Sequence, residues 1–250
     1  MWYINKRKVD SMYNTVLLKL SGEALGDEHG PYNFEMLDDL AKQIKALVKK
    51  GVNVGIVCGG GNICRGRTFE KLGMDRKKSD YVGMCATVMN AQVMGEALTN
   101  NGVDNKVFTC YPVKNVIDYD PVKARKAIKK GTVCIFGGGI GKPGYSTDTA
   151  CAQRAYDIEA DVILFAKNGC DGVYDKDPNV YEDAVRYDEI SYDDIIKKDL
   201  QVIDIAAAKI CRKHGIKGLV FDMAAKDAIK KSCNRKPNGT LIKEETRTGY

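Results

Sequence analysis

Short apolar runs alternate with segments of helical periodicity along most of this chain, and that alternation constrains the possible folds more than any other feature. The runs at 15–20, 52–57, 132–136 and 161–166 are almost continuously apolar, as in strands that are buried on both faces. Residues 34–48, between the first two runs, place their apolar side chains at helical spacing. The pattern predicts an α/β protein, a three-layer αβα sandwich with a mostly parallel central sheet.

Two glycine-rich turns follow predicted strands. The first reads Gly-Gly-Gly-Asn-Ile-Cys-Arg-Gly over residues 59–66, and the second, over 137–148, leads into a helical segment. Backbone N–H groups at strand-to-helix turns readily face an anion, and Arg65 adds a cation to the first turn. Ligands of parallel α/β sheets bind beyond the carboxyl ends of the strands, where both turns and Lys19 fall. The sequence therefore predicts a phosphate-binding site.

The composition suits one large globular domain, since 44% of the 250 residues are hydrophobic and 29% are charged. The basic residues behind the net charge of +6 are scattered over polar faces, as on a solvated surface. No nucleic acid partner is required to explain them. No run approaches the roughly 20 apolar residues of a membrane span, and the basic N-terminus lacks a signal-peptide core, so we expect a cytoplasmic protein. The nine cysteines, an odd number with no Cys-x-x-Cys pair, predict free thiols rather than zinc ligands or disulfides.

We expect a single domain over residues 13–242, because no Pro/Gly/Ser-rich linker divides the chain. Residues 1–12 precede the first strand and are interpreted as an N-terminal extension. Residues 243–250 follow the last predicted strand and are interpreted as a C-terminal tail.

Two familiar nucleotide-binding motifs fit the second turn poorly. A Walker A loop needs one more residue than 137–142 provides, and Pro143 follows the lysine where the motif requires Ser or Thr. The glycine spacing of a dinucleotide fingerprint occurs at 139–144, but Pro143 interrupts it and Lys167 stands near the place of the expected acid. Both readings are disfavoured.

A combination of motifs is more specific. A strand ends in Lys-Leu-Ser-Gly at 19–22, the triple glycine is followed by Arg65, and the second turn ends in Ser-Thr-Asp at 146–148. With the further segments 83–90, 157–161 and 171–178, the chain resembles, over residues 13–242, the amino acid kinase superfamily and within it the bacterial uridylate kinases. The resemblance implies transfer of the γ-phosphoryl group of ATP to UMP, giving ADP and UDP for pyrimidine nucleotide biosynthesis. It also implies that Mg²⁺ is carried on the nucleotide, and no protein metal ligand is assigned.

The resemblance implies three sets of site residues. The catalytic set is Lys19, Arg65 and Asp148. The ATP set is Lys19, Leu20, Ser21, Gly22, Gly61, Arg65, Asn168, Tyr174 and Asp177. The UMP set is Gly60, Asp80, Ile140, Gly141, Lys142, Pro143, Gly144, Tyr145, Ser146 and Thr147. Asp204 resembles a further acidic position of the family, and its role is left open.

Elementary chemistry supports these roles, but plainer readings compete with them. Lys19 would offset charge on the transferred phosphoryl group, or it is a strand-end lysine whose ammonium reaches solvent. Asp80 either contacts the UMP ribose or is an ordinary acid at the start of the long helix. Asp148 either orients a lysine or Mg²⁺ or caps a helix. Tyr174 either stacks on adenine or packs in a turn.

Departures from the family pattern concern regulation and the acceptor base. Residues 29–33 differ where the family associates this region with GTP activation, and Gly144-Tyr145 replaces a frequent phenylalanine pair. The resemblance also implies a homohexamer, a trimer of dimers, with the segment 83–90 as a candidate contact. The alternatives are a sister kinase acting on an amino acid or carbamate, and a non-catalytic nucleotide-binding regulatory protein on the same fold.

Overall fold

The computed structural model describes residues 13–64, 66–234 and 237–244. The predicted catalytic residue Arg65, the extension 1–12 and most of the predicted tail lie outside the described residues. The strands are β1 (Thr15–Leu20), β2 (Asn53–Cys58), β3 (Asn105–Thr109), β4 (Ile117–Asp118), β5 (Val133–Gly137), β6 (Val162–Lys167), β7 (Val173–Tyr174), β8 (Arg186–Tyr187), β9 (Glu189–Ser191), β10 (Lys217–Asp222) and β11 (Thr240–Lys243). The helices are the 3₁₀ turn η1 (Gly22–Leu25), α1 (Phe34–Lys49), α2 (Gly66–Glu70), α3 (Arg76–Asn100), α4 (Pro121–Ile128), α5 (Thr147–Asp157), α6 (Tyr192–Lys197), α7 (Ile205–His214) and α8 (Ala228–Ser232).

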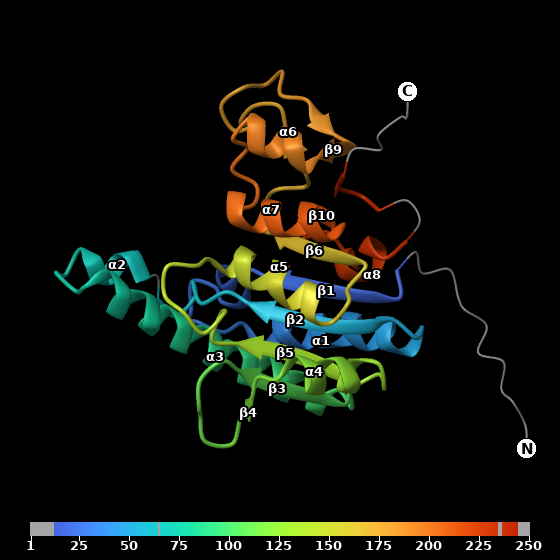
Figure 1. Ribbon diagram of the computed structural model, residues 1–250. Helices are drawn as coiled ribbons and strands as arrows, with labels where there is room; N and C mark the ends of the chain where they lie inside the picture. Colours follow the sequence, from blue (N-terminus) through green and yellow to red (C-terminus); the bar gives the residue numbers. More distant parts are fainter. Residues whose placement is uncertain (1–12, 65, 235–236, 245–250) are drawn as a thin grey trace, which may run out of the picture.

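Nine strands form one sheet in the order β4-β3-β5-β2-β1-β6-β10-β11-β9 (Figure 1). Its neighbouring strands run parallel except for β10 and β11, which are antiparallel. A separate antiparallel pair joins β7 and β8. The predicted mostly parallel sheet is therefore confirmed, and β1 lies near its centre with β2 on one side and β6 on the other.

Helices cover both faces of the large sheet, as predicted. Helices α1, α3 and α8 pack on the face that carries Leu18 and Leu20 of β1. Helices α4 to α7 pack on the other face, which carries Leu17. Successive side chains of a strand point to opposite faces, so Lys19 points to the same face as Leu17. Each fully buried leucine of these layers stabilises the fold by about 1.5–3 kcal/mol.

Local sequence signals begin and end several of these elements. Asn33 accepts a hydrogen bond from Met36 N and caps α1, and Asp120 caps α4 just before a proline at its first position. Gly215 ends α7 in the left-handed conformation, with a φ of 63°. His214 in the last turn packs against Tyr156, with ring centres 4.0 Å apart, which is a structural environment.

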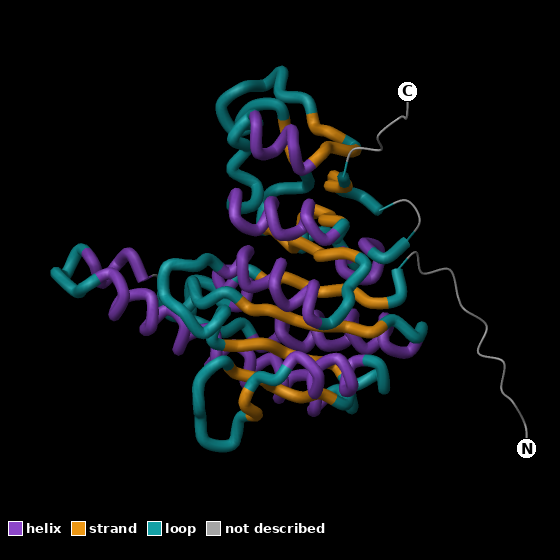
Figure 2. Tube along the Cα trace, viewed as in Figure 1, coloured by secondary structure: helices purple, strands orange, loops and turns teal. Residues whose placement is uncertain are grey.

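Some boundaries differ from the sequence expectations. Helix α3 begins at Arg76, with Asp75 as its cap, so Asp80 lies in the second turn rather than at the start of the long helix. Strand β11 extends to Lys243, one residue into the predicted tail. Helix α2 and the first turns of α3 project from the body on the left of Figures 1 and 2. Among the described residues, no helix combines the length and apolar character needed to cross a membrane.

Candidate active site

An ion pair lies at the carboxyl end of the central strand. Lys19 Nζ is 3.3 Å from Asp148 Oδ1, and the two side chains are only 12% and 15% exposed. Asp148 belongs to the first turn of α5, which packs on the same face of the sheet as Lys19. The cap of this helix is Ser146, whose Oγ accepts a hydrogen bond from Thr149 N at 3.1 Å. Asp148 is therefore free of the capping role and faces the lysine.

The end of β1 packs directly against the first glycine loop, residues 59–64. Gly59 N donates to Leu20 O at 2.9 Å. A Cβ atom on Gly22 would lie 2.4 Å from Gly61 N and 2.7 Å from Gly59 O, so no side chain fits between the two backbones. The Lys-Leu-Ser-Gly turn and the triple glycine thus form one packed unit.

Helix α3 holds the first glycine loop from the other side. Asn90 is fully buried, and its Nδ2 donates to Gly59 O at 2.6 Å and to Asn62 Oδ1 at 2.7 Å. A Cβ atom on Gly60 would lie 2.9 Å from Ala86 Cβ and equally close to a helix carbonyl. Because buried polar groups are costly unless paired, this network specifies one position for the loop.

The second glycine loop, residues 137–146, is also attached to α3. Gly138 and Gly139 have φ angles of 77° and 59°, which glycine adopts without strain. Gly138 N donates to Thr87 Oγ1 at 2.8 Å, and Gly144 N donates to Asp80 Oδ2 at 2.7 Å. Asp80 is thus more than a surface acid of the helix, because its carboxylate joins α3 to the loop.

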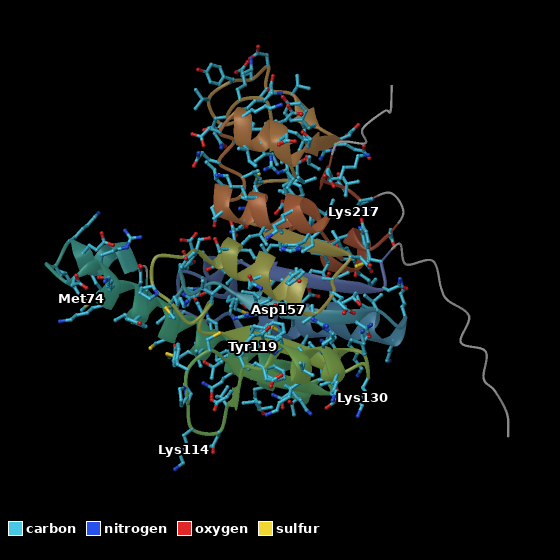
Figure 3. The ribbon with its side chains drawn as sticks, in the orientation of Figure 1. Met74, Lys114, Tyr119, Lys130, Asp157 and Lys217 are labelled. Carbon is cyan, nitrogen blue, oxygen red and sulfur yellow. The ribbon has the colours of Figure 1, made fainter. Side chains whose placement is uncertain are left out.

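Arg154 of α5 is buried beneath the second glycine loop. Its Nη2 donates to Gly139 O at 3.0 Å and to Cys110 Sγ at 2.8 Å, and its Nη1 pairs with Asp157 at 3.0 Å. The guanidinium carbon lies 3.7 Å from the centre of the Tyr119 ring, whose hydroxyl donates to Asp157 (Figure 3). Burial raises the pKa of the Cys110 thiol, and the guanidinium opposes that rise. Arg154 therefore anchors the loop from inside the protein.

A cavity of about 960 Å³ lies between the two glycine loops, α3 and α5. The predicted residues that line it are Gly60, Gly61, Asp80, Gly144, Tyr145, Ser146 and Thr147. Within the described part of the chain, residues 140–143 of the same loop do not line this cavity. Its volume suits a ligand the size of a nucleotide.

Three predicted ATP residues, Asn168, Tyr174 and Asp177, lie across β1 from this cavity, beyond the end of β6. Asn168 and Asp177 are exposed, and Asp177 Oδ1 accepts a turn hydrogen bond from Asn179 N at 2.9 Å. The Tyr174 hydroxyl donates to Asp171 Oδ1 at 2.7 Å. That hydrogen bond is the largest cause of the lowered pKa of the Asp171 carboxyl. We call this region, residues 167–177, the β6 side, and the cavity with its two loops the α3 side.

Comparison with known proteins gives this geometry a family. The sequence pattern of the amino acid kinase family matches residues 14–222. The chain belongs to the amino acid kinase family. It is 45% identical over 232 residues to the uridylate kinase of Mycoplasma capricolum, covering 92% of this chain and 98% of that protein. It is 41% identical over 231 residues to the uridylate kinase of Streptomyces avermitilis, with 92% of each chain covered.

Solved structures agree with these relatives. The UMP kinase of Bacillus anthracis superimposes with a TM-score of 0.90 at 35% identity, covering 94% of this chain and 97% of that one. The UMP kinase of Ureaplasma parvum superimposes with a TM-score of 0.88 at 35% identity, covering 92% and 99%. The predicted resemblance to the amino acid kinase family is thus confirmed in both sequence and fold.

The structure adds residues to the site of this amino acid kinase family member that the sequence reasoning missed or left open. Thr87 and Asn90 fall within the quoted segment 83–90, and their polar side chains on a buried helix face were the available signal. Asp204 caps α7 through Ala207 N at 2.7 Å and accepts hydrogen bonds from Thr149 Oγ1 and Ser146 Oγ. It therefore links α7 to the start of α5 at the wall of the cavity.

Proposed function

We propose that this chain is an ATP-dependent uridylate kinase that transfers the γ-phosphoryl group of ATP to UMP and releases ADP and UDP. The observation that carries the proposal is the largely buried Lys19–Asp148 pair, set at the end of β1 beside the two glycine loops that line the cavity. The relatives named uridylate kinase cover nearly the whole chain and support the same acceptor.

The chemistry requires positioning and charge neutralisation more than covalent help from the protein. Charge spreads over the transferred group in the transition state, and a fixed ammonium beside it lowers the barrier. Lys19 supplies that ammonium, and Asp148 holds it in place. The acceptor phosphate has a second pKa of about 6 and is already ionised at neutral pH, so no general base is needed.

The two substrates bind on opposite sides of β1. The α3 side receives UMP, with its phosphate near Gly60 and its remaining contacts drawn from Asp80 and residues 140–147. The β6 side receives ATP through Asn168, Tyr174 and Asp177, with its phosphates over Lys19, Leu20, Ser21, Gly22 and Gly61. Arg65 is assigned to the ATP contacts from its position in the sequence motif, since it lies outside the described residues. Gly60 and Gly61 thus stand between the two phosphate groups.

Magnesium enters as part of the substrate. Within the described part of the chain, no group of three or more acidic, histidine or cysteine side chains is placed to hold a metal ion. Mg²⁺ in kinases is bound mainly by phosphate oxygens, with one or two carboxylates and water. Asp148 is the carboxylate closest to that role here, since it already faces the phosphate end of the site.

The wider setting follows from the same proposal. We place the enzyme in the cytoplasm, in pyrimidine nucleotide biosynthesis, as a homohexamer. Met89, in the segment 83–90, leaves half of its surface exposed on α3, which suits a subunit contact. Light scattering tests the hexamer, and a monomer at working concentration would contradict it. We expect any effect of GTP to act through residues 29–33, since Asn62 of the first glycine loop donates to Pro31 O at 2.7 Å.

An acceptor panel tests the function directly. Purified protein with MgATP is offered UMP, CMP, aspartate, glutamate and carbamate in turn, and ADP release is followed. We expect UMP to support turnover. Turnover with another acceptor and none with UMP would replace the assignment with a sister kinase, and no turnover with any acceptor would favour a binding protein.

A further inference from the structure

A second lysine points toward the Lys19–Asp148 pair. Lys167 is the last residue of β6, which lies next to β1 in the sheet (Figure 1). The two strands pair so that Lys19 lies beside Phe165. Paired residues of parallel strands share a face, so Lys167, two residues beyond Phe165, points to the same face as Lys19. That face is covered by α5, whose first turn carries Asp148.

Lys167 has no dedicated partner in the described part of the chain. No hydrogen bond or ion pair joins its Nζ to any described residue, and its nearest charged influences are Asp148 and Lys19. Its neighbour Asp222 in β10 accepts backbone N–H groups at Oδ1, from Gly169 at 3.3 Å and from Ala224 at 3.0 Å, and forms no ion pair with Lys167. Lys19 and Lys167 thus point to one face of the sheet, and Asp148 is the acidic group that acts most strongly on Lys167.

This arrangement leaves one positive charge without compensation in a partly buried place. Burial is the largest influence on Lys167 and lowers its pKa, Asp148 acts in the opposite direction, and Lys19 lowers the pKa further. Ammonium groups removed from water are normally paired, because desolvation is costly. The site thus carries more positive than negative charge, and a bound anionic ligand would balance it.

We propose that Lys167 is a second phosphate-binding lysine, which contacts the polyphosphate chain of the nucleotide donor from β6 while Lys19 contacts it from β1. The proposal rests on the proposed function for the identity of the reaction. The donor is favoured over the acceptor because β6 lies across β1 from the cavity of the α3 side and leads directly into Asn168.

The distances allow both lysines to serve one ligand. Neighbouring strands lie about 4.8 Å apart and rise about 3.3 Å per residue, which places the two Cα atoms about 8 Å apart. Extended lysine side chains from those positions reach adjacent phosphates of one triphosphate. A tetrahedral phosphate accepts hydrogen bonds from several cations at once, so the second lysine complements the first.

The plainer reading is that Lys167 is structural, with its aliphatic stem packed and its ammonium hydrated. The two readings differ in what happens when the charge is removed. If only the aliphatic stem matters, Lys167→Met keeps the length of the side chain and should leave MgATP binding unchanged. If the ammonium binds phosphate, the same substitution should weaken MgATP binding.

Equilibrium binding of MgATP without UMP tests the proposal on three variants. We expect Lys167→Met to weaken MgATP binding at least about tenfold, as loss of a charge-assisted hydrogen bond does. Lys167→Arg, which keeps the charge, should stay within about threefold of the wild type. The control is Lys217→Met, at the exposed opposite end of β10, and it should change nothing (Figure 3). UMP binding, measured separately, should be the same in all variants.

Folded Lys167→Met protein that binds MgATP within twofold of the wild type would overturn the proposal. Loss of UMP binding instead of MgATP binding would also overturn it, because the lysine would then serve the acceptor. The acceptor panel remains an independent test, since a wild type silent toward UMP would remove the uridylate kinase assignment while the MgATP measurement still decides the role of Lys167.

Discussion

The two sides of β1 are built differently. On the α3 side, buried polar side chains hold both glycine loops, with Asn90 on the first and Thr87 and Arg154 on the second. On the β6 side, Asn168 and Asp177 are exposed, and Tyr174 bonds only to nearby Asp171 among the described residues. A rigid site loses little conformational entropy on binding, whereas exposed side chains must be ordered by the ligand. We infer that the acceptor side is preformed and that the donor side is completed by the nucleotide.

The largest expected effect comes from Lys19 of β1, which lies between the two sides. Lys19→Met should lower kcat for UDP formation by about a thousandfold, as loss of a group that stabilises transition-state charge does. Steady-state kinetics measures the effect, and circular dichroism checks the fold. Normal turnover would show that Lys19 has no catalytic role.

Arg154 tests whether the α3 side is rigid because of its buried network. Arg154→Met leaves Asp157 buried without its cation and frees the Gly139 carbonyl, so we expect a loss of about 3 kcal/mol in the free energy of unfolding. The KM for UMP should rise while MgATP binding is unchanged. The matched control is Arg212→Met, which removes a solvent-exposed ion pair with Asp193 and should cost under about 1 kcal/mol.

An Arg154→Met protein that lost MgATP binding and kept its UMP affinity would reverse the comparison, because the network would then support the donor side.

Gly60 tests the contact between the first glycine loop and α3. Gly60→Ala places a methyl group 2.9 Å from Ala86 Cβ and a helix carbonyl, and such overpacking typically costs about 1–3 kcal/mol. The loop must shift, so the KM for UMP should also rise. Gly30→Ala is the control, because its Cβ would meet nothing within 4 Å. Denaturant unfolding and acceptor kinetics measure both variants, and equal behaviour would contradict the tight packing.

The smallest expected effect concerns the stability of the unliganded β6 side. Burial lowers the pKa of Lys167 below its ordinary value, so the positive charge of this lysine costs stability in the folded protein. Lys167→Met should therefore raise the melting temperature of the nucleotide-free protein by a few degrees at most, since each 1 kcal/mol shifts it by about 2–4 °C in a chain of this size.

The sign of the pH dependence follows from the same pKa. The folded protein releases the Lys167 proton at a lower pH than the unfolded chain, so the penalty disappears as the pH rises toward 10.5. The advantage of Lys167→Met should accordingly shrink with rising pH. Thermal unfolding between pH 7 and 10 measures the trend, and a variant less stable than the wild type at pH 7 would indicate a structural lysine.

Much of the fold was predictable because its signals are local. Continuous apolar runs marked the buried parallel strands, and Asn33 and Gly215 marked helix ends through hydrogen bonds and backbone angles of their own neighbourhoods. Helix faces were less certain. Met89 of α3 is half exposed although Val88 and Asn90 beside it are buried, because it lies on the outer face of the helix.

In the candidate site, too, some features were predictable from the sequence and others were not. The residue types in the Lys-Leu-Ser-Gly turn and the two glycine loops were sufficient to indicate phosphate chemistry, since backbone N–H groups and a lysine suit no other ligand as well. The anchoring contacts were not predictable, because Arg154 reaches Cys110 across 44 residues of sequence and Asn90 reaches Gly59 across 31. Such pairs depend on the order of the strands, which local patterns do not encode.

The sequence by itself determined that this is a parallel α/β protein with lysine, aspartate and glycine at the ends of its strands. Only the tertiary structure decided that Lys19 Nζ and Asp148 Oδ1, from a strand and a helix far apart in the chain, lie 3.3 Å apart, and that Lys167 points to the same face of the sheet as Lys19. The physical reason is that strand order and register choose which side chains share a face, and that choice is made by the packing of the whole sheet.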